Sequence, residues 1–407
     1  MAQLSDKSTA LWVVRRLRSA GHVALFAGGC VRDMLMGRRP ADYDVATDAT
    51  PDQVERLFPR VLLVGAKFGV AMVIHRGRKV EVTTFRSDVS YSDGRRPDSV
   101  RFSCPREDAS RRDFTINGMF YDPVAGQVVD YVGGRRDLAA KVIRTIGRPE
   151  DRFAEDYLRM LRAVRFAVRF GFCIAPGTAA AVRKFAPRIT SISGERIYEE
   201  LTKMLSLDSA ATALRTLDAL GLAAELLPEL FRAEGLWAAA NDRVARLAGR
   251  RDVVLAFAGL LADLPPAEVR RLIRRWGAPN ELRDTVCFLA RRLNEWRTAA
   301  DLPLCDFKRL LAADDFRRLL AMWRVEELTR TGRETHSRRI ARRARGIAQD
   351  RIAPPPLVTG GDLKDMGLPE GPQVGRILRE LYDAQLNEEL RSRTHALHRA
   401  REMIRAL

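Results

Sequence analysis

The pattern of apolar and polar residues changes near residue 150. Before it, short apolar or alternating stretches are bounded by glycine, proline and polar residues, which is typical of strands joined by turns. The strands that this pattern predicts cover residues 23–27, 42–47, 61–64, 70–75, 80–85 and 128–131. From residue 152 onward, helical patterns alternate with short polar breaks. The chain is therefore predicted to be an α+β protein, with a small mixed head and a long helical remainder.

Two aspartates, Asp42 and Asp44, are candidate metal ligands. If their segment is extended, residues two apart face the same side. Hard cations such as Mg²⁺ take oxygen ligands, usually one or two carboxylates together with substrate phosphates. Glu81 is the candidate third carboxylate, because it alternates with apolar neighbours as in a half-buried strand. An acid-x-acid pair by itself is equally a polar turn.

A glycine pair precedes these acids. The apolar run 23–27 ends at Gly28 and Gly29, and a helix is predicted from residue 31 to about 35. A strand, a glycine turn and a helix start can cradle phosphate, because the backbone approaches closely and free N–H groups favour an anion. Arg32 would add a cation; the alternative is a plain turn with Arg32 in solvent. Together, the turn and the acids indicate metal-dependent nucleotidyl transfer.

This segment resembles the head motif of class II tRNA nucleotidyltransferases and bacterial poly(A) polymerases. The matching residues are Gly28, Gly29, Val31, Arg32, Asp33, Leu35, Gly37, Arg38, Pro40, Asp42, Asp44, Ala46 and Thr47. Three further segments resemble family motifs in the same order: residues 111–119, with Gly118 where Ala is more usual, the base-selecting motif at 155–165, and residues 193–197, which close the neck helices. The resemblance is strong over residues 20–205 and weak beyond them.

The resemblance implies a polymerase-β-like nucleotidyltransferase head, a mixed sheet with helices, followed by an all-helical neck, body and tail. The expected bounds are 1–150 for the catalytic head, 151–205 for the base-selecting neck, 206–352 for the body and 353–407 for a tRNA-binding tail. A run of prolines at 354–356 separates the tail.

The activity that the resemblance implies is template-independent addition of C, C and A to the 3′ end of tRNA. CTP and ATP would be the donors, pyrophosphate would leave, and two metal ions would assist. Asp42 and Asp44 would hold Mg²⁺, with Glu81 as a further catalytic acid. The nucleotide would be bound by Gly29, Arg32, Arg112, Asn117, Asp156, Arg159, Arg162 and Arg165.

Residues 152–169 are predicted to form one helix that carries the base-selecting motif. A solvated charged face with an Asp156–Arg159 pair is one interpretation. The resemblance implies instead that these two side chains read the Watson–Crick edge of the base. Cytosine and adenine present an amino donor beside an acceptor, and uracil and guanine present the reverse order. Arg162 and Arg165 would contact triphosphate or pack the helix. Similarly, Arg112 either contacts the nucleotide or pairs with Asp113 between head and neck.

Two segments bear on the alternatives, an A-adding specialist and a bacterial poly(A) polymerase. Residues 88–98 form a polar, glycine- and proline-containing loop, predicted to be mobile, whose counterparts in the family accompany addition of the final A. Residues 64–70 resemble the tRNA nucleotidyltransferase form, because Ala66 and Gly69 depart from the poly(A) polymerase variant. A non-catalytic RNA-binding protein is disfavoured, since all three candidate carboxylates are present.

Composition agrees with an RNA substrate. The chain has 407 residues, a net charge of +18 and a pI near 10.4, which favours a polyanionic partner, although an arginine-rich proteome would give the same excess. Five widely spaced cysteines suggest neither a disulfide framework nor a zinc site. With no membrane-span pattern and no signal-like start, the chain is expected to be cytoplasmic. Four tryptophans of the C-terminal half either line an RNA surface or belong to the core: Trp237, Trp276, Trp296 and Trp323.

Overall fold

The computed structural model describes residues 6–65, 69–88 and 100–407. The chain divides into two compact units, Met1–Arg232 and Ala233–Leu407. The predicted head and neck both fall in the first unit, and the predicted tail falls in the second. The loop predicted at residues 88–98 and the centre of the 64–70 segment lie outside the described residues.

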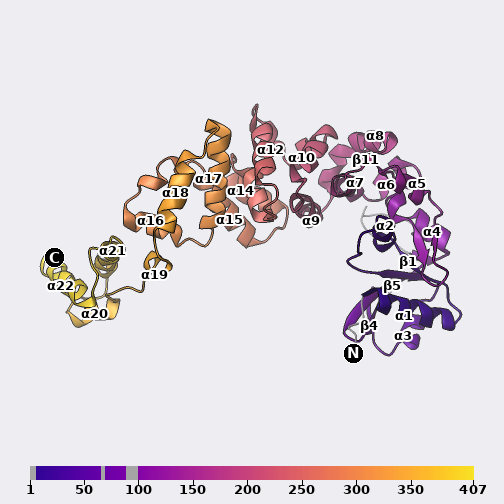
Figure 1. Ribbon diagram of the computed structural model, residues 1–407, viewed down its shortest axis with the longest axis horizontal. Helices are drawn as coiled ribbons and strands as arrows, with labels where there is room; N and C mark the ends of the chain where they lie inside the picture. Colours follow the sequence, from indigo (N-terminus) through magenta and orange to yellow (C-terminus); the bar gives the residue numbers. More distant parts are fainter. Residues whose placement is uncertain (1–5, 66–68, 89–99) are drawn as a thin grey trace. The chain divides into compact units, whose positions relative to one another are not determined.

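A seven-stranded mixed sheet forms the head, in the order β3-β4-β5-β2-β1-β8-β9 (Figure 1). Within it β2 and β5 pair in parallel, and the other neighbours pair antiparallel. The six predicted strands are confirmed with small shifts at their ends, and β8 is an addition. The bounds are β1 Ala24–Ala27, β2 Asp44–Thr47, β3 Val61–Gly65, β4 Val70–His75, β5 Arg78–Thr84, β8 Phe120–Asp122 and β9 Gln127–Val129.

The two faces of the sheet are covered differently. Helices α1 (Asp6–Ser19) and α3 (Pro51–Leu57) supply Val14, Leu17 and Val54 to a core that includes Phe26 and Val45 of the sheet. The opposite face carries a smaller cluster of Leu25, Ala27, Ala46, Phe85, Phe120 and, from α4 (Pro105–Ser110), Ala109. Because side chains alternate along a strand, Asp44 shares this second face with Ala46.

Short elements connect the head to the neck. They are α2 Gly29–Leu35, the 3₁₀ turn η2 Thr115–Asn117, α5 Gly134–Ala139, and two small strand pairs, β6 Arg86–Asp88 with β7 Val100–Phe102 and β10 Val142–Ile143 with β11 Cys173–Ile174. The expectation that everything beyond residue 152 is helical is wrong at β11, which is held by its parallel pairing with β10.

The helix predicted over residues 152–169 is interrupted at Asp156. This residue has extended backbone angles, φ −157° and ψ 104°, and separates α6 from α7. Its Oδ1 accepts a hydrogen bond from the backbone N–H of Leu158 at 3.0 Å, which satisfies a donor at the start of α7. The short polar side chain competes with the helical backbone and stabilises the break. The helices of the first unit from residue 149 onward are α6 Pro149–Glu155, α7 Leu158–Phe170, α8 Pro176–Phe185, α9 Gly194–Leu205, α10 Ala210–Ala219 and α11 Leu222–Leu226, with 3₁₀ turns η3 Ala186–Ser191 and η4 Pro228–Phe231.

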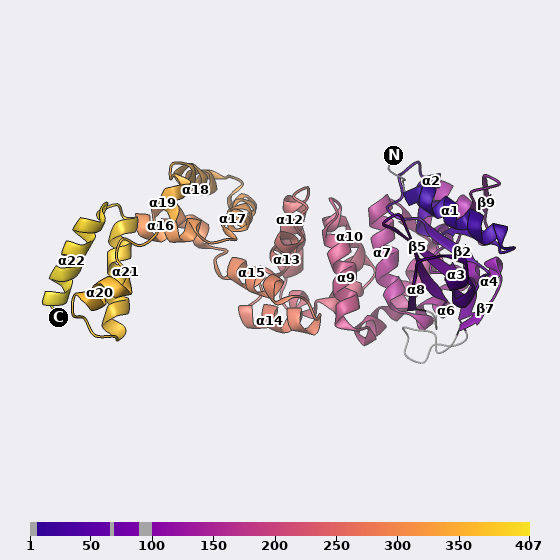
Figure 2. The same ribbon diagram turned by 90° about the horizontal axis from the view of Figure 1, so that it is seen from below.

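The neck is held together by the apolar side of α7, where Leu161 and Val164 are fully buried. Helices α9 and α10 pack against this side and against each other, and Figure 2 shows them side by side in pink. Another side of α7 faces the head, because its Ala163, Phe166, Ala167 and Phe170 belong to the core that also contains Phe26 and Val45.

The second unit is helical throughout its described elements. Trp276, Trp296 and Trp323 are buried in it, so the core interpretation of these three tryptophans is confirmed, whereas Trp237 is partly exposed. None of the described helices is long and apolar enough to cross a membrane. The elements are α12 Leu236–Leu247, α13 Val253–Leu261, α14 Pro266–Arg275, α15 Asn280–Arg291, η5 Glu295–Arg297, η6 Ala299–Asp301, α16 Leu304–Leu311, α17 Phe316–Thr331, α18 Thr335–Arg345, α19 Gln349–Ile352, α20 Gly360–Asp365, α21 Pro372–Leu386 and α22 Arg393–Arg405.

Candidate active site

A polar cavity of about 490 Å³ lies where the glycine turn, the start of β2, the 111–117 segment and α7 meet. Every predicted site residue except Glu81 lines it. Sequence reasoning left out of the site several of the lining residues, among them Arg111, Phe166 and Arg169. The full lining is Gly28, Gly29, Arg32, Asp42, Asp44, Arg111, Arg112, Asp113, Asn117, Asp156, Arg159, Arg162, Arg165, Phe166 and Arg169.

Glu81 lies in an adjoining cavity of about 230 Å³, which shares Asp44, Arg111 and Arg112 with the larger one. Strand β2 pairs in parallel with β5, with Val45 opposite Val82, so the preceding residues, Asp44 and Glu81, occupy neighbouring positions on one face. Glu81 therefore lies beside Asp44 on the neighbouring strand, in the adjoining cavity.

The carboxylates repel one another. Burial, together with the nearby charges of Asp42 and Glu81, raises the pKa of Asp44 to about 7, and Arg112 partly opposes the shift. A cation at this position would favour the charged form. The described residues contain no group of three or more His, Cys, Asp or Glu side chains placed to enclose a metal ion. Two carboxylates beside an anion pocket instead fit a divalent cation that takes its other ligands from substrate phosphates and water.

The glycine turn requires glycine at its first position. Gly28 has φ 70° and ψ −126°, and a Cβ atom there would lie 2.8 Å from Nη1 of Arg112. Its absence lets the Arg112 guanidinium lie directly against the turn. The Gly28 N–H donates to the Met119 carbonyl at 3.2 Å, so a phosphate bound at this turn would meet the backbone N–H of Gly29 and this cation.

Arg32 is buried and belongs to a chain of polar contacts. Its Nη1 donates to Oδ1 of Asn117 at 2.6 Å, and Asn117 Nδ2 donates to Oδ1 of Asp113 at 3.0 Å. Asp113 in turn pairs with Arg162 of α7 at 2.7 Å. The interpretation that left Arg32 in solvent is wrong, because its side chain is only 5% exposed.

Arg111 and Arg112 are held by one buried acid, Asp108, at 2.7 and 2.9 Å. Burial acts to raise the pKa of Asp108, but the two guanidiniums hold it below its ordinary value. The Arg112–Asp113 pair considered from the sequence is wrong; the link between head and neck is Asp113–Arg162. Sequence reasoning missed Asp108, although an acid three and four residues before two arginines is the signal of such a pair on a helix.

The residues predicted to select the base have partners other than each other. Asp156 accepts two hydrogen bonds from Arg196 of α9, at 3.2 and 2.7 Å, and Arg159 pairs with Glu155 at 2.5 Å. The alternative weighed from the sequence, a solvated face with an Asp156–Arg159 ion pair, is not supported by these contacts. An ionised carboxylate accepts about four hydrogen bonds. Asp156 receives three from described residues, two from Arg196 and one from Leu158, so an acceptor position remains for a ligand.

Arg165 lines the cavity but is committed to the neck. Its Nε donates to Oε2 of Glu200 on α9 at 2.5 Å, and both side chains are less than 10% exposed. Its guanidinium also lies 4.2 Å from the centre of the Phe166 ring. Of the two functions weighed for Arg165, helix packing is the one that these contacts support.

Comparisons with known proteins place the chain beside one group of enzymes. Residues 24–144 match the poly A polymerase head domain, and residues 171–234 match the probable RNA and SrmB-binding site of polymerase A. The CCA-adding enzyme of Geobacillus kaustophilus is 35% identical over 404 residues, which cover 96% of this chain and 95% of that protein. The CCA-adding enzyme of Bacillus subtilis is 39% identical over 321 residues, covering 78% and 80%.

Solved structures agree. The crystal structure of the Bacillus stearothermophilus CCA-adding enzyme in complex with CTP matches with a TM-score of 0.78 and 32% identity, and covers 100% of both chains. The Thermotoga maritima CCA-adding enzyme complexed with tRNA matches with a TM-score of 0.69 at 18% identity, covering 98% and 96%, which shows a shared fold.

Replacing Gly28 by Ala is expected to weaken binding of a nucleoside triphosphate roughly tenfold, because the added Cβ displaces Arg112. Titration calorimetry with CTP measures the effect. Gly37→Ala is the matched control, since Gly37 has a similar φ of 67° but no atom within 4 Å of the added Cβ. Equal affinity loss in both variants would attribute the effect to backbone strain alone.

Replacing Glu200 by Ala is expected to destabilise the first unit by about 3–5 kcal/mol, because Arg165 is left buried without its partner. Thermal unfolding followed by circular dichroism measures it. The double variant Arg165→Met, Glu200→Leu should recover most of the loss. The control is Glu199→Ala, whose side chain is 66% exposed and whose ion pair, with Lys203, is long at 3.8 Å. A Glu200→Ala protein as stable as this control would contradict the packing function of Arg165.

Proposed function

Because the chain belongs to the CCA-adding enzyme family of tRNA nucleotidyltransferases, we propose that it adds C, C and A to the 3′ end of tRNA from CTP and ATP, with release of pyrophosphate. The observation that carries this proposal is a single cavity in which two carboxylates, a glycine turn with arginines, and an Asp/Arg pair meet. Nucleotidyl transfer requires these three elements: a metal platform, a triphosphate site and a base-reading site.

Asp42 and Asp44 are the residues that would hold the divalent metal, which we propose is Mg²⁺. Bound there, it would supply Lewis-acid stabilisation of charge at the α-phosphate, the attacking 3′-hydroxyl and the leaving pyrophosphate. Arg32 and Arg112 hold the triphosphate against the glycine turn, since both guanidiniums line the cavity and are fixed from behind by acids. Glu81 adds negative charge behind Asp44 and favours a cation at the pair.

Base choice rests on Asp156 and Arg159. The carboxylate accepts from the amino group of cytosine or adenine, and the guanidinium donates to the adjacent ring nitrogen. Uracil and guanine would place donor against donor and acceptor against acceptor, which leaves buried polar groups unmatched. Arg196 fixes the plane of the Asp156 carboxylate through its two hydrogen bonds. One site can thus accept two different bases without a template.

The alternatives have less support. A poly(A) polymerase is not favoured, because the relatives that match nearly the whole chain are CCA-adding enzymes. An A-adding specialist would need the same cavity, and the loop that bears on it, residues 88–98, lies outside the described part. A non-catalytic RNA-binding protein would not require two carboxylates that repel each other beside a triphosphate site.

We place the reaction in the cytoplasm, with tRNA, CTP and ATP as partners. The five cysteines are free, which fits a reducing compartment. The net charge of +18 fits a polyanionic substrate.

The test is incorporation of labelled CTP and ATP, with Mg²⁺, into tRNA that ends at the discriminator base, into tRNA that ends in CC, and into oligo(A). Completion of CCA on the first substrate is the expected result. Extension of tRNA-CC alone would indicate an A-adding specialist, and long tails on oligo(A) a poly(A) polymerase.

Asp44→Asn is the variant that ties this activity to the metal platform. It should lower incorporation at least a thousandfold without loss of thermal stability, because removing one of three crowded carboxylates relieves repulsion. Asp52→Asn, at an exposed acid in the first turn of α3, is the control and should keep full activity. Substantial incorporation by the Asp44→Asn protein would overturn the assignment.

Asp156→Asn is expected to relax base choice. The amide presents a donor as well as an acceptor, so discrimination against UTP should fall about tenfold to a hundredfold in kcat/KM while CTP incorporation also declines. Single-nucleotide incorporation with each of the four NTPs measures it. Asp151→Asn, at an exposed residue of α6, is the control. An unchanged ratio of CTP to UTP incorporation would show that Asp156 does not read the base.

A further inference from the structure

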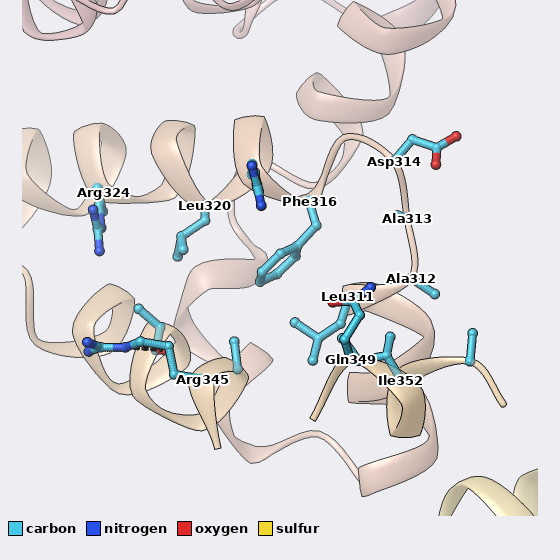
Figure 3. Close-up of a pocket in the computed structure, with 14 residues that line it drawn as sticks. Leu311, Ala312, Ala313, Asp314, Phe316, Leu320, Arg324, Arg345, Gln349 and Ile352 are labelled. Carbon is cyan, nitrogen blue, oxygen red and sulfur yellow. Dashed lines mark hydrogen bonds between the residues drawn. The ribbon is translucent and has the colours of Figure 1, made fainter. Parts of the chain in front are cut away.

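A second large cavity, of about 880 Å³, lies within the unit Ala233–Leu407. It is formed by the end of α16, the first half of α17, the end of α18 and the short helix α19. In Figure 3, Phe316 and Leu320 project into it from α17, and Arg324 and Arg345 extend toward the same end of the pocket. None of the residues assigned to the active site belongs to this cavity.

Its arginines differ from their neighbours in lacking acidic partners. Within the described residues, no acidic side chain pairs with Arg317, Arg324 or Arg345. By contrast, Arg318 in the same helix pairs with Asp252 at 2.8 Å, and Arg339 in α18 pairs with Asp301. The lining therefore carries three arginines and a single acid, Asp314. No ion pair joins Asp314 to these arginines among the described residues, so the lining has an excess of positive charge.

Arg324 carries the clearest sign of a missing partner. Its Nε atom is buried and has no acceptor in the structure. A buried donor without an acceptor is costly, and more so when it belongs to a charged group. Arg324 itself lines the cavity beside Arg317 and Arg345, so an anionic oxygen bound there would meet three guanidinium side chains.

The rest of the lining is apolar and aromatic. Phe316, Leu311, Leu320 and Ile352 lie on different sides of the space, and Gln349 adds an amide that both donates and accepts. A site for phosphate alone would not need these apolar and aromatic side chains. A base has a flat face that stacks on an aromatic ring, and its edge is read by groups such as this amide. The volume is in the range of pockets that hold organic ligands of nucleotide size.

We propose that this cavity is a second nucleotide-binding site, in which the arginines hold the phosphate and Phe316 stacks on the base. The ligand chemistry is a nucleoside phosphate, and two sources supply it: a free nucleotide, or an unpaired nucleotide of the bound RNA. The proposal concerns binding outside the catalytic cavity, so it goes beyond the transfer reaction. It is tested by measuring ligand binding and does not require catalytic turnover.

The experiment uses the full chain and has two arms. Equilibrium dialysis with labelled ATP gives the number of nucleotides bound per chain, and gel-shift titration at fixed salt gives the dissociation constant for tRNA. The variants are Arg345→Gln, at an exposed position that does not threaten folding, Arg324→Gln, and Phe316→Leu, which keeps apolar volume but removes the ring. Arg342→Gln is the matched control, because Arg342 is exposed on α18 and does not line the cavity.

If a free nucleotide is the ligand, the wild type binds two ATP per chain. The three cavity variants then weaken the second site about tenfold, and the control leaves it unchanged. If the ligand is an RNA nucleotide, one ATP binds per chain, and the cavity variants weaken tRNA binding about tenfold relative to the control. A single ATP site together with tRNA affinities equal to that of Arg342→Gln overturns the proposal. A loss in the arginine variants without one in Phe316→Leu overturns base stacking. Incorporation of CTP, measured in parallel, reports separately on the catalytic assignment.

Discussion

The carboxylate of Asp113 is the contact on which the active site depends. One oxygen accepts from the Asn117 amide, which in turn holds Arg32, and the other pairs with Arg162 of α7. Burial opposes the charge, but Arg162 and Asn117 keep the pKa of Asp113 below its ordinary value, so the anion persists. Because this single group joins the glycine turn to the neck helix, the triphosphate site and the base-reading site keep a fixed distance. Removing it would take the acidic partner from Arg162 and an acceptor from Asn117, whereas Arg32 would keep its pair with Asp33 at 2.7 Å.

Similar ion pairs recur around the cavity, where acidic side chains hold the arginines that line it. Asp108 fixes Arg111 and Arg112, and Glu155 fixes Arg159. Each guanidinium has five N–H donors, so a pair with one carboxylate does not use all of them. Side chains held in this way lose little conformational entropy when the nucleotide binds. The positively charged side chains around the cavity are thereby held in fixed positions. The cavity of the second unit contrasts with this, since its arginines have no acids behind them among the described residues.

The proposed base recognition depends on a broken helix. A continuous helix through residues 152–169 would have placed Asp156 and Arg159 within reach of each other, and their pair would have used the groups that must meet the base. The break at Asp156 turns its carboxylate toward Arg196, while Arg159 turns to Glu155. The two side chains thus line one cavity without neutralising each other. At the break, the Leu158 N–H donates to the Asp156 carboxylate.

Residues close in sequence could be predicted because local geometry controls them. Strand alternation put Asp44 on the face away from α1, and the glycine turn beside Arg32 followed from its backbone requirements. The resemblance to known motifs then assigned ten of the fifteen residues that line the cavity to the site. Partners distant in sequence could not be predicted. Glu200 is 35 residues from Arg165, Arg196 is 40 from Asp156, and Asp113 is 49 from Arg162. The packing of α7 against α9 and against the head selects these partners. An acid that pairs with an arginine on another element leaves no periodic signal in the sequence. The sequence alone therefore determined which groups are available for the proposed reaction, and the tertiary structure decided which acid holds each arginine, because only packing brings the elements that carry them together.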